Sequence, residues 1–141
     1  ANRVMHRGAE LAADPAFRPD LGEAWSVAKI YYCVVPYSFL QAGIDALAAA
    51  GQSEIFGNAT RAEEIGFGVP DEEVSAIIQA DGFVEAKMAA MRAHATQITV
   101  DGPFFALSNH LGQKIWGTEC FQLVHGTLGP GRPESDLFAG L

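Results

Sequence analysis

The stretch Val27-Ala28-Lys29-Ile30-Tyr31-Tyr32-Cys33-Val34-Val35 carries the strongest strand signal in the chain. It is rich in β-branched and aromatic residues, which are favoured in strands. Its apolar residues continue almost without alternation, a pattern typical of a strand covered on both faces. Pro36 follows at a position where a helix can begin. The sequence therefore predicts a strand that leads directly into a helix.

Helices are expected on both sides of this strand. Downstream, apolar residues recur at helical spacing and Gly51 suits the C-terminal cap; the stripe consists of Leu40, Ile44 and Leu47. Upstream, Asn2–Ala13 has an amphipathic helical pattern, and Asp14-Pro15 ends it because the residue before proline is pushed out of the α region. Asp14–Ala24 then forms a loop, and Gln52–Arg61 is expected to be a polar, mobile loop.

Short strands and one more clear helix are expected in the second half of the chain. The helix has an apolar stripe of Val84, Met88, Met91 and Ala95. The expected strands are Glu64–Val69, Val74–Gln79, Ile98–Val100, Phe104–Leu107 and Glu119–His125. For the second of these strands, Asp71-Glu72-Glu73 could equally start a helix. Ser108-Asn109 suits a helix N-cap before a short helix over Leu111–Trp116. Strands between helices indicate an α/β or α+β fold.

Composition excludes several classes of protein. The chain has 141 residues, of which 49% are apolar and 18% charged, so a single globular domain is expected. The net charge of −8 argues against a nucleic-acid surface, which needs clustered Lys and Arg. The apolar runs are too short to span a bilayer. We therefore expect a cytoplasmic protein with neither nucleic acid nor membrane as a partner.

The cysteines and histidines give no complete catalytic or metal site. Cys33 and Cys120 lie singly in apolar runs, which favours reduced core thiols over a disulfide. No CxxC pair indicates a zinc or redox site. The four histidines lack the HExxH spacing of a zinc helix, and the i,i+4 pair of His6 and Glu10 is typical of a solvated helix face. His125 follows a strand and is expected to be exposed. No GxSxG nucleophile motif occurs.

His94 is the most informative histidine, because it lies at the end of the clear helix, in Arg92–Gln97. A protonated histidine near a helix C-terminus is stabilised by the helix dipole. In a structural interpretation, His94 and Gln97 bond the last helical carbonyls. In a functional interpretation, they face a binding site in a longer protein.

Five segments together resemble a known enzyme family. Ala86–Gln97 contains a Lys, small residues and then Ala-His-Ala-Thr-Gln. This resembles a late helix in the family of the N-acetylglucosaminyl-phosphatidylinositol de-N-acetylases. Phe105–Asn109, Glu134–Leu141, Arg18–Glu23 and Ala28–Tyr32 resemble the actinobacterial branch of that family, and the resemblance covers nearly the whole chain.

The resemblance implies the C-terminal portion of a Rossmann-like, zinc-dependent hydrolase. In that family, zinc is held by H-P-D-D and H-P-D-H motifs, and neither motif occurs here. We therefore expect no catalytic residue and no metal ligand in this chain, and zinc bound to an N-terminal half that docks on it. Phe67 matches a position where the family places an aromatic residue near the substrate; the alternative is a core position. His94 is the second candidate for substrate binding.

The resemblance leaves the reaction open between two hydrolases of the same branch. One removes acetate from N-acetylglucosaminyl-inositol in mycothiol biosynthesis, and the other is the mycothiol S-conjugate amidase. Ala106–Asn109 favours the deacetylase, whereas Trp116–Glu119 is closer to the amidase. A non-catalytic binding module derived from this lobe is a third hypothesis. Because Ala1 is not Met and the chain starts within an expected helix, we expect a piece of a longer protein.

Overall fold

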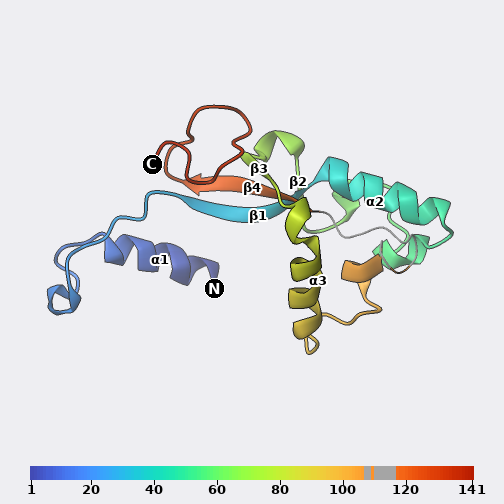
Figure 1. Ribbon diagram of the computed structural model, residues 1–141, viewed down its shortest axis with the longest axis horizontal. Coiled ribbons are helices and arrows are strands. Elements are labelled where there is room, and N and C mark those ends of the chain that lie inside the picture. The colour runs from blue at the N-terminus through green and yellow to red at the C-terminus, as the bar shows by residue number, and fades with distance from the viewer. Residues whose placement is uncertain (107–108, 110–116) are drawn as a thin grey trace.

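The centre of the molecule is a mixed β-sheet. The computed structural model describes residues 1–106, 109 and 117–141, and within them four strands form one sheet in the order β2-β1-β4-β3 (Figure 1). The strands are β1 (Ile30–Pro36), β2 (Gly68–Val69), β3 (Ala76–Gln79) and β4 (Thr118–His125). β1 pairs with β4 in antiparallel register and with β2 in parallel register. β4 also pairs with β3, again antiparallel.

Three α-helices surround this sheet in the described part of the chain. They are α1 (Asn2–Ala12), α2 (Tyr37–Ala49) and α3 (Val84–Ala93). Single 3-10 turns connect them: Pro19–Leu21, Ser53–Phe56, Ala62–Glu64, Asp71–Glu73, Asp81–Phe83 and Pro103–Phe105. The expected mixture of helices and strands is confirmed. No helix among the described residues is both long enough and apolar enough to cross a membrane.

The passage from β1 into α2 agrees with its prediction. Pro36 is the last residue of β1 and the N-cap of α2. The apolar stripe of α2 is buried, at Leu40, Ile44 and Leu47. Proline offers no capping side chain, so Asp71 accepts a hydrogen bond from the backbone N–H of Ser38 at 3.0 Å. A carboxylate at this end of a helix is favourable because unpaired N–H groups point towards it.

Burial of the strand residues differs from what their sequence predicts. Within β1 only Pro36 is buried, and Cys33 is exposed. The prediction of a strand covered on both faces is therefore wrong for this chain, because the elements on either side shield its side chains only in part. Cys120 on β4 is buried, and both cysteines are free. The prediction of a core thiol is thus confirmed for Cys120 and wrong for Cys33.

Of the other expected strands, Glu119–His125 is confirmed as β4, and two more are confirmed in shortened form. Val74–Gln79 forms a strand over Ala76–Gln79, while Asp71–Glu73 forms a 3-10 turn and no helix. The strand expected at Glu64–Val69 is reduced to Gly68–Val69, because Ala62–Glu64 turns instead. Gly68 allows close packing here: a Cβ atom on it would lie 2.5 Å from Leu40 Cδ1.

The segment after α3 folds against that helix and not into the sheet. Ile98–Val100 was expected as a strand but is irregular, and Pro103–Phe105 is a 3-10 turn. Both strand predictions are wrong where the chain is described. The reason is that Phe105 is buried in a cluster with Val84 and Met88, against which Ile98 also packs. Leu107, Ser108 and the helix expected at Leu111–Trp116 lie outside the described residues.

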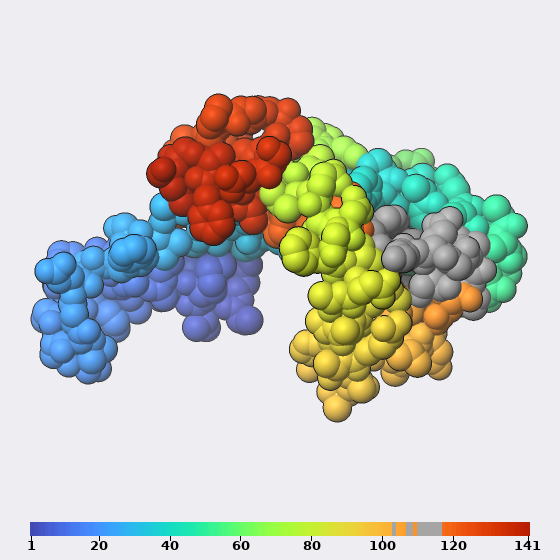
Figure 2. Space-filling view, in the orientation of Figure 1, coloured from blue at the N-terminus to red at the C-terminus, as the bar shows by residue number. Residues whose placement is uncertain are grey.

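The elements are distributed unevenly around the sheet. Figure 1 shows α1 and α3 on one side of it and the C-terminal segment on the other. In the space-filling view of Figure 2, the molecule is hollowed between α1 (blue) and α3 (yellow). None of the residues of α1 is buried, although its sequence is amphipathic. The apolar residues of α1 are therefore exposed, as Val4 and Met5 are, or only half-buried, as Leu11 is.

Replacing Leu47 by Ala tests the packing of α2. Leu47 is 1% exposed, and truncating a buried leucine costs about 2–5 kcal/mol of unfolding free energy. We expect a loss of this size in urea denaturation followed by circular dichroism. Leu21→Ala is the matched control, because Leu21 is 73% exposed and surface changes stay within about 0.5 kcal/mol. Equal losses in both variants would contradict the assignment of α2 to the core.

Candidate functional site

Phe67 lies on the surface, in the turn that leads into β2. Its side chain is 62% exposed, and its backbone N–H donates to the carbonyl oxygen of Ile65 at 2.9 Å. The alternative of a core position therefore does not hold in this chain. An exposed aromatic ring offers an apolar face with a polar edge, which suits contact with the C–H surface of a sugar. The predicted role in substrate binding remains a prediction.

His94 caps the C-terminal end of α3 through its backbone. Its N–H donates to the carbonyl oxygen of Met91 at 3.1 Å, and its own carbonyl accepts from the N–H groups of Gln97 and Ile98, both at 2.8 Å. Among the described residues, none forms a hydrogen bond with its imidazole ring, which is exposed. The main chain of His94 thus joins the end of α3 to the segment that follows, and its role in substrate binding remains a prediction.

The structure does not bring the two candidates together. Figure 1 shows β2 within the sheet, whereas α3 ends at a distance from the sheet. No hydrogen bond or ring contact joins Phe67 to His94 among the described residues.

A cluster of three side chains that sequence reasoning missed lies at the start of α3. Lys87 Nζ is 2.6 Å from Glu119 Oε1, and Cys33 Sγ is 3.8 Å from Glu119 Oε2. Although Cys33 is exposed as a residue, the protein atoms around its sulfur remove part of the water and raise the pKa of the thiol. The Glu119 carboxylate raises this pKa further, and Lys87 partly opposes the increase. A raised pKa keeps the sulfur protonated and makes it a poor nucleophile. Nothing in the sequence signals this cluster, because its members come from three distant elements.

A second group of polar side chains lies between α1 and the sheet. The Tyr32 hydroxyl is 2.6 Å from His6 Nε2 and accepts a hydrogen bond from Asn2 at 2.7 Å. Glu10 pairs with Arg7 at 2.9 Å. Next to these residues is a cavity of about 390 Å³, lined by His6, Ala9, Glu10, Ala13, Ser26, Val27, Ile30 and His125. His125 is exposed, as predicted.

These groups do not make a metal centre. Hydrolytic zinc requires three protein ligands and an open position for water. Within residues 1–106, 109 and 117–141, no three His, Cys, Asp or Glu side chains lie together as metal ligands would. The donor set of these described residues therefore does not fit zinc.

The known proteins to which this chain is similar share one name. No family model matches the chain. Over its whole length, however, it is similar to curated proteins named as deacetylases. These relatives are each named 1D-myo-inositol 2-acetamido-2-deoxy-α-D-glucopyranoside deacetylase: 56% identity over 142 residues in Geodermatophilus obscurus, 49% over 145 in Nocardioides sp. and 45% over 141 in Streptomyces avermitilis.

The match is complete for this chain and partial for its relatives. All of the chain aligns with each of the three proteins, whereas it covers 48% of each of them. The chain therefore spans about half the length of the curated relatives it matches. It is homologous throughout to that half of these deacetylases, as the resemblance of its motifs predicts.

Glu119→Gln tests the electrostatic environment of Cys33. Removing the carboxylate charge lowers the pKa of the thiol, so more thiolate is present at a fixed pH. We expect faster alkylation of Cys33 by iodoacetamide at pH 8, measured by mass spectrometry of the Cys33 peptide. Glu72→Gln, at an exposed carboxylate outside the cluster, should leave the rate unchanged. A rate that stays the same in Glu119→Gln would show that Glu119 does not act on the thiol.

Proposed function

We propose that this chain forms one half of a metal-dependent deacetylase that hydrolyses the acetamide of N-acetylglucosaminyl-inositol in mycothiol biosynthesis. The observation that carries the proposal is its alignment, along its whole length, with about half of each of three proteins named for this reaction. Those names favour the deacetylase over the S-conjugate amidase.

The work of the described residues in such an enzyme is recognition. Hydrolysis of an amide needs an activated water, a proton donor and stabilisation of the oxyanion. A bound zinc would supply the activated water, and we propose that its ligands belong to the part of the deacetylase that this chain does not span. Phe67 would pack on the sugar ring, and the His94 imidazole would exchange hydrogen bonds with hydroxyl groups of the substrate.

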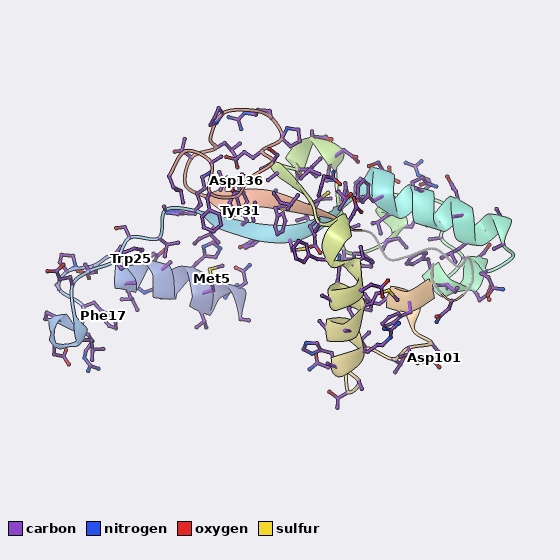
Figure 3. All side chains as sticks on the ribbon, viewed as in Figure 1. Met5, Phe17, Trp25, Tyr31, Asp101 and Asp136 are labelled. Atoms are coloured by element: carbon purple, nitrogen blue, oxygen red, sulfur yellow. The ribbon has the colours of Figure 1, made fainter. Side chains whose placement is uncertain are left out.

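Exposed apolar side chains support a large protein partner. They gather on α1 and on the segment after it: Val4, Met5, Phe17, Leu21 and Trp25. Figure 3 shows Met5 on α1 and, further along, Phe17 and Trp25 on the chain that leads to β1. Apolar patches of this kind are typical of protein interfaces. We propose that the other half of the deacetylase covers them.

Recombining the two halves tests the function. We expect release of acetate from N-acetylglucosaminyl-inositol when this chain is mixed with the other half of the Geodermatophilus obscurus relative in the presence of zinc. The chain alone should release none. A charged residue in the interface weakens docking, so Trp25→Glu should reduce the recovered activity, and Phe138→Glu, at an equally exposed aromatic residue outside the patch, should not. A stable monodisperse chain that never binds the other half would instead favour the non-catalytic binding module.

Substitution of the two candidate residues tests their role in the recombined enzyme. Loss of an aromatic contact is worth about 0.5–1.5 kcal/mol, so Phe67→Leu should raise KM about two- to tenfold with a smaller effect on kcat. His94→Gln should also raise KM, because the side-chain amide places its hydrogen-bonding atoms at other positions than the imidazole nitrogens do. Phe83→Leu and His125→Gln are matched exposed controls. An unchanged KM in both candidate variants would remove Phe67 and His94 from the substrate site.

A further inference from the structure

The C-terminal segment is bound to the edge of the sheet at Glu134. The N–H of Ile77 donates to the Glu134 carbonyl at 2.8 Å, and the N–H of Glu134 donates to the Ser75 carbonyl at 2.9 Å. Residue 134 thereby adds one strand position beside β3. This segment contains the Glu134–Leu141 motif, to which the proposed function gives no role.

The Glu134 side chain is buried and fully partnered. Lys29 Nζ lies 2.8 Å from Glu134 Oε1, with exposed side-chain fractions of 5% for Lys29 and 0% for Glu134. The Tyr31 hydroxyl donates to the other carboxylate oxygen, and the N–H of Gly129 donates to Oε1. Lys29 also donates to the carbonyl of Ala139 at 2.7 Å. One ion pair therefore connects the start of β1 with residues 129–139, which we call the strap.

The ion pair lies where the N-terminal part of the chain joins the sheet. The N–H of Trp25 donates to the carbonyl of Ala12 at 2.8 Å, so α1 and the segment after it are connected. Residues 1–28 will be called the arm. Tyr31 and Tyr32 are adjacent in β1, and successive side chains of a strand point to opposite faces. Tyr31 bonds the strap, and Tyr32 bonds His6 of the arm.

We propose that the strap is a conformational device that fixes the arm relative to the sheet by closing on Lys29. Breaking the pair on one side leaves a buried charge without its partner, which is strongly unfavourable. The remaining charge regains water only if the strap leaves the sheet. Local openings of this kind occur as cooperative units with free energies below that of global unfolding. Opening of the strap then also loosens the start of β1 and the arm.

The charge on Glu134 controls this closure. The groups that face its carboxylate are Lys29 and Tyr31 from β1 and the backbone N–H of Gly129, while Asp136 bonds the N–H of Phe138 within the strap. Lys29 is the main cause that lowers the pKa of Glu134 to about 2. Because the pKa of Glu134 is lowered when the strap is closed, the ionised carboxylate stabilises the closed state at every pH above the ordinary carboxyl pKa of 4.5. This stabilisation is lost as the pH falls from 4.5 to about 2.

Hydrogen exchange in the intact chain tests the strap. Glu134→Gln keeps the shape of the side chain and removes its charge. We expect at least tenfold faster exchange at pH 7 in peptides from residues 126–141 and 22–32, with α3 unchanged as an internal reference. Asp136→Asn, which removes an exposed carboxylate of the same strap, should leave exchange as in the natural chain. Unchanged exchange in Glu134→Gln, or equal acceleration in α3, would overturn the proposal.

A milder variant and a second measurement keep the test decisive if Glu134→Gln does not fold. Glu134→Asp retains the charge and shortens its reach by one methylene, so we expect partial opening. Acylation of the Lys29 amine reports the open state, because the amine is buried when the strap is closed. Its acylation should be slow in the natural chain relative to Lys87 and faster in Glu134→Asp. Fast acylation of Lys29 in the natural chain would show that the strap does not close.

Discussion

The ion pair between Lys29 and Glu134 joins the two ends of the described chain. Lys29 lies at the point where the arm becomes β1, and Glu134 reaches it from the segment that follows β4. Both side chains are out of contact with water, so each charge depends on the other and on the groups around it. Tyr31, Gly129 and Ala139 complete these partners.

β1 links the regions in which function would reside. At its start, Tyr32 holds α1 through His6, and at its end Pro36 begins α2. Between them, Cys33 faces Glu119, which also binds Lys87 of α3. The helices therefore owe their positions to one strand and its two neighbours. Figure 2 shows the hollow that lies between α1 and α3.

Both candidate binding residues combine a hydrogen-bonded backbone with an exposed side chain. Phe67 and His94 lie at the ends of regular elements, where the backbone is fixed by hydrogen bonds and the side chains are exposed. Rigid backbone with exposed side chains is suited to contact with a second surface. The chain aligns with about half of each relative, and most residues of its amphipathic α1 are exposed.

The sequence by itself determined the local elements. Apolar runs and helical stripes predicted β1, β3, β4 and all three α-helices, because periodicity and capping residues act within a few positions of each other. The motif around His94 and four further segments resembled the deacetylase family, and the comparisons support that resemblance. Tertiary structure alone decided the rest. Phe105 packs against α3 and not in the sheet, and Cys33 is exposed. Lys29 pairs with Glu134, which is 105 positions away in the sequence. Such contacts depend on which distant segments come together, and no local sequence pattern encodes that.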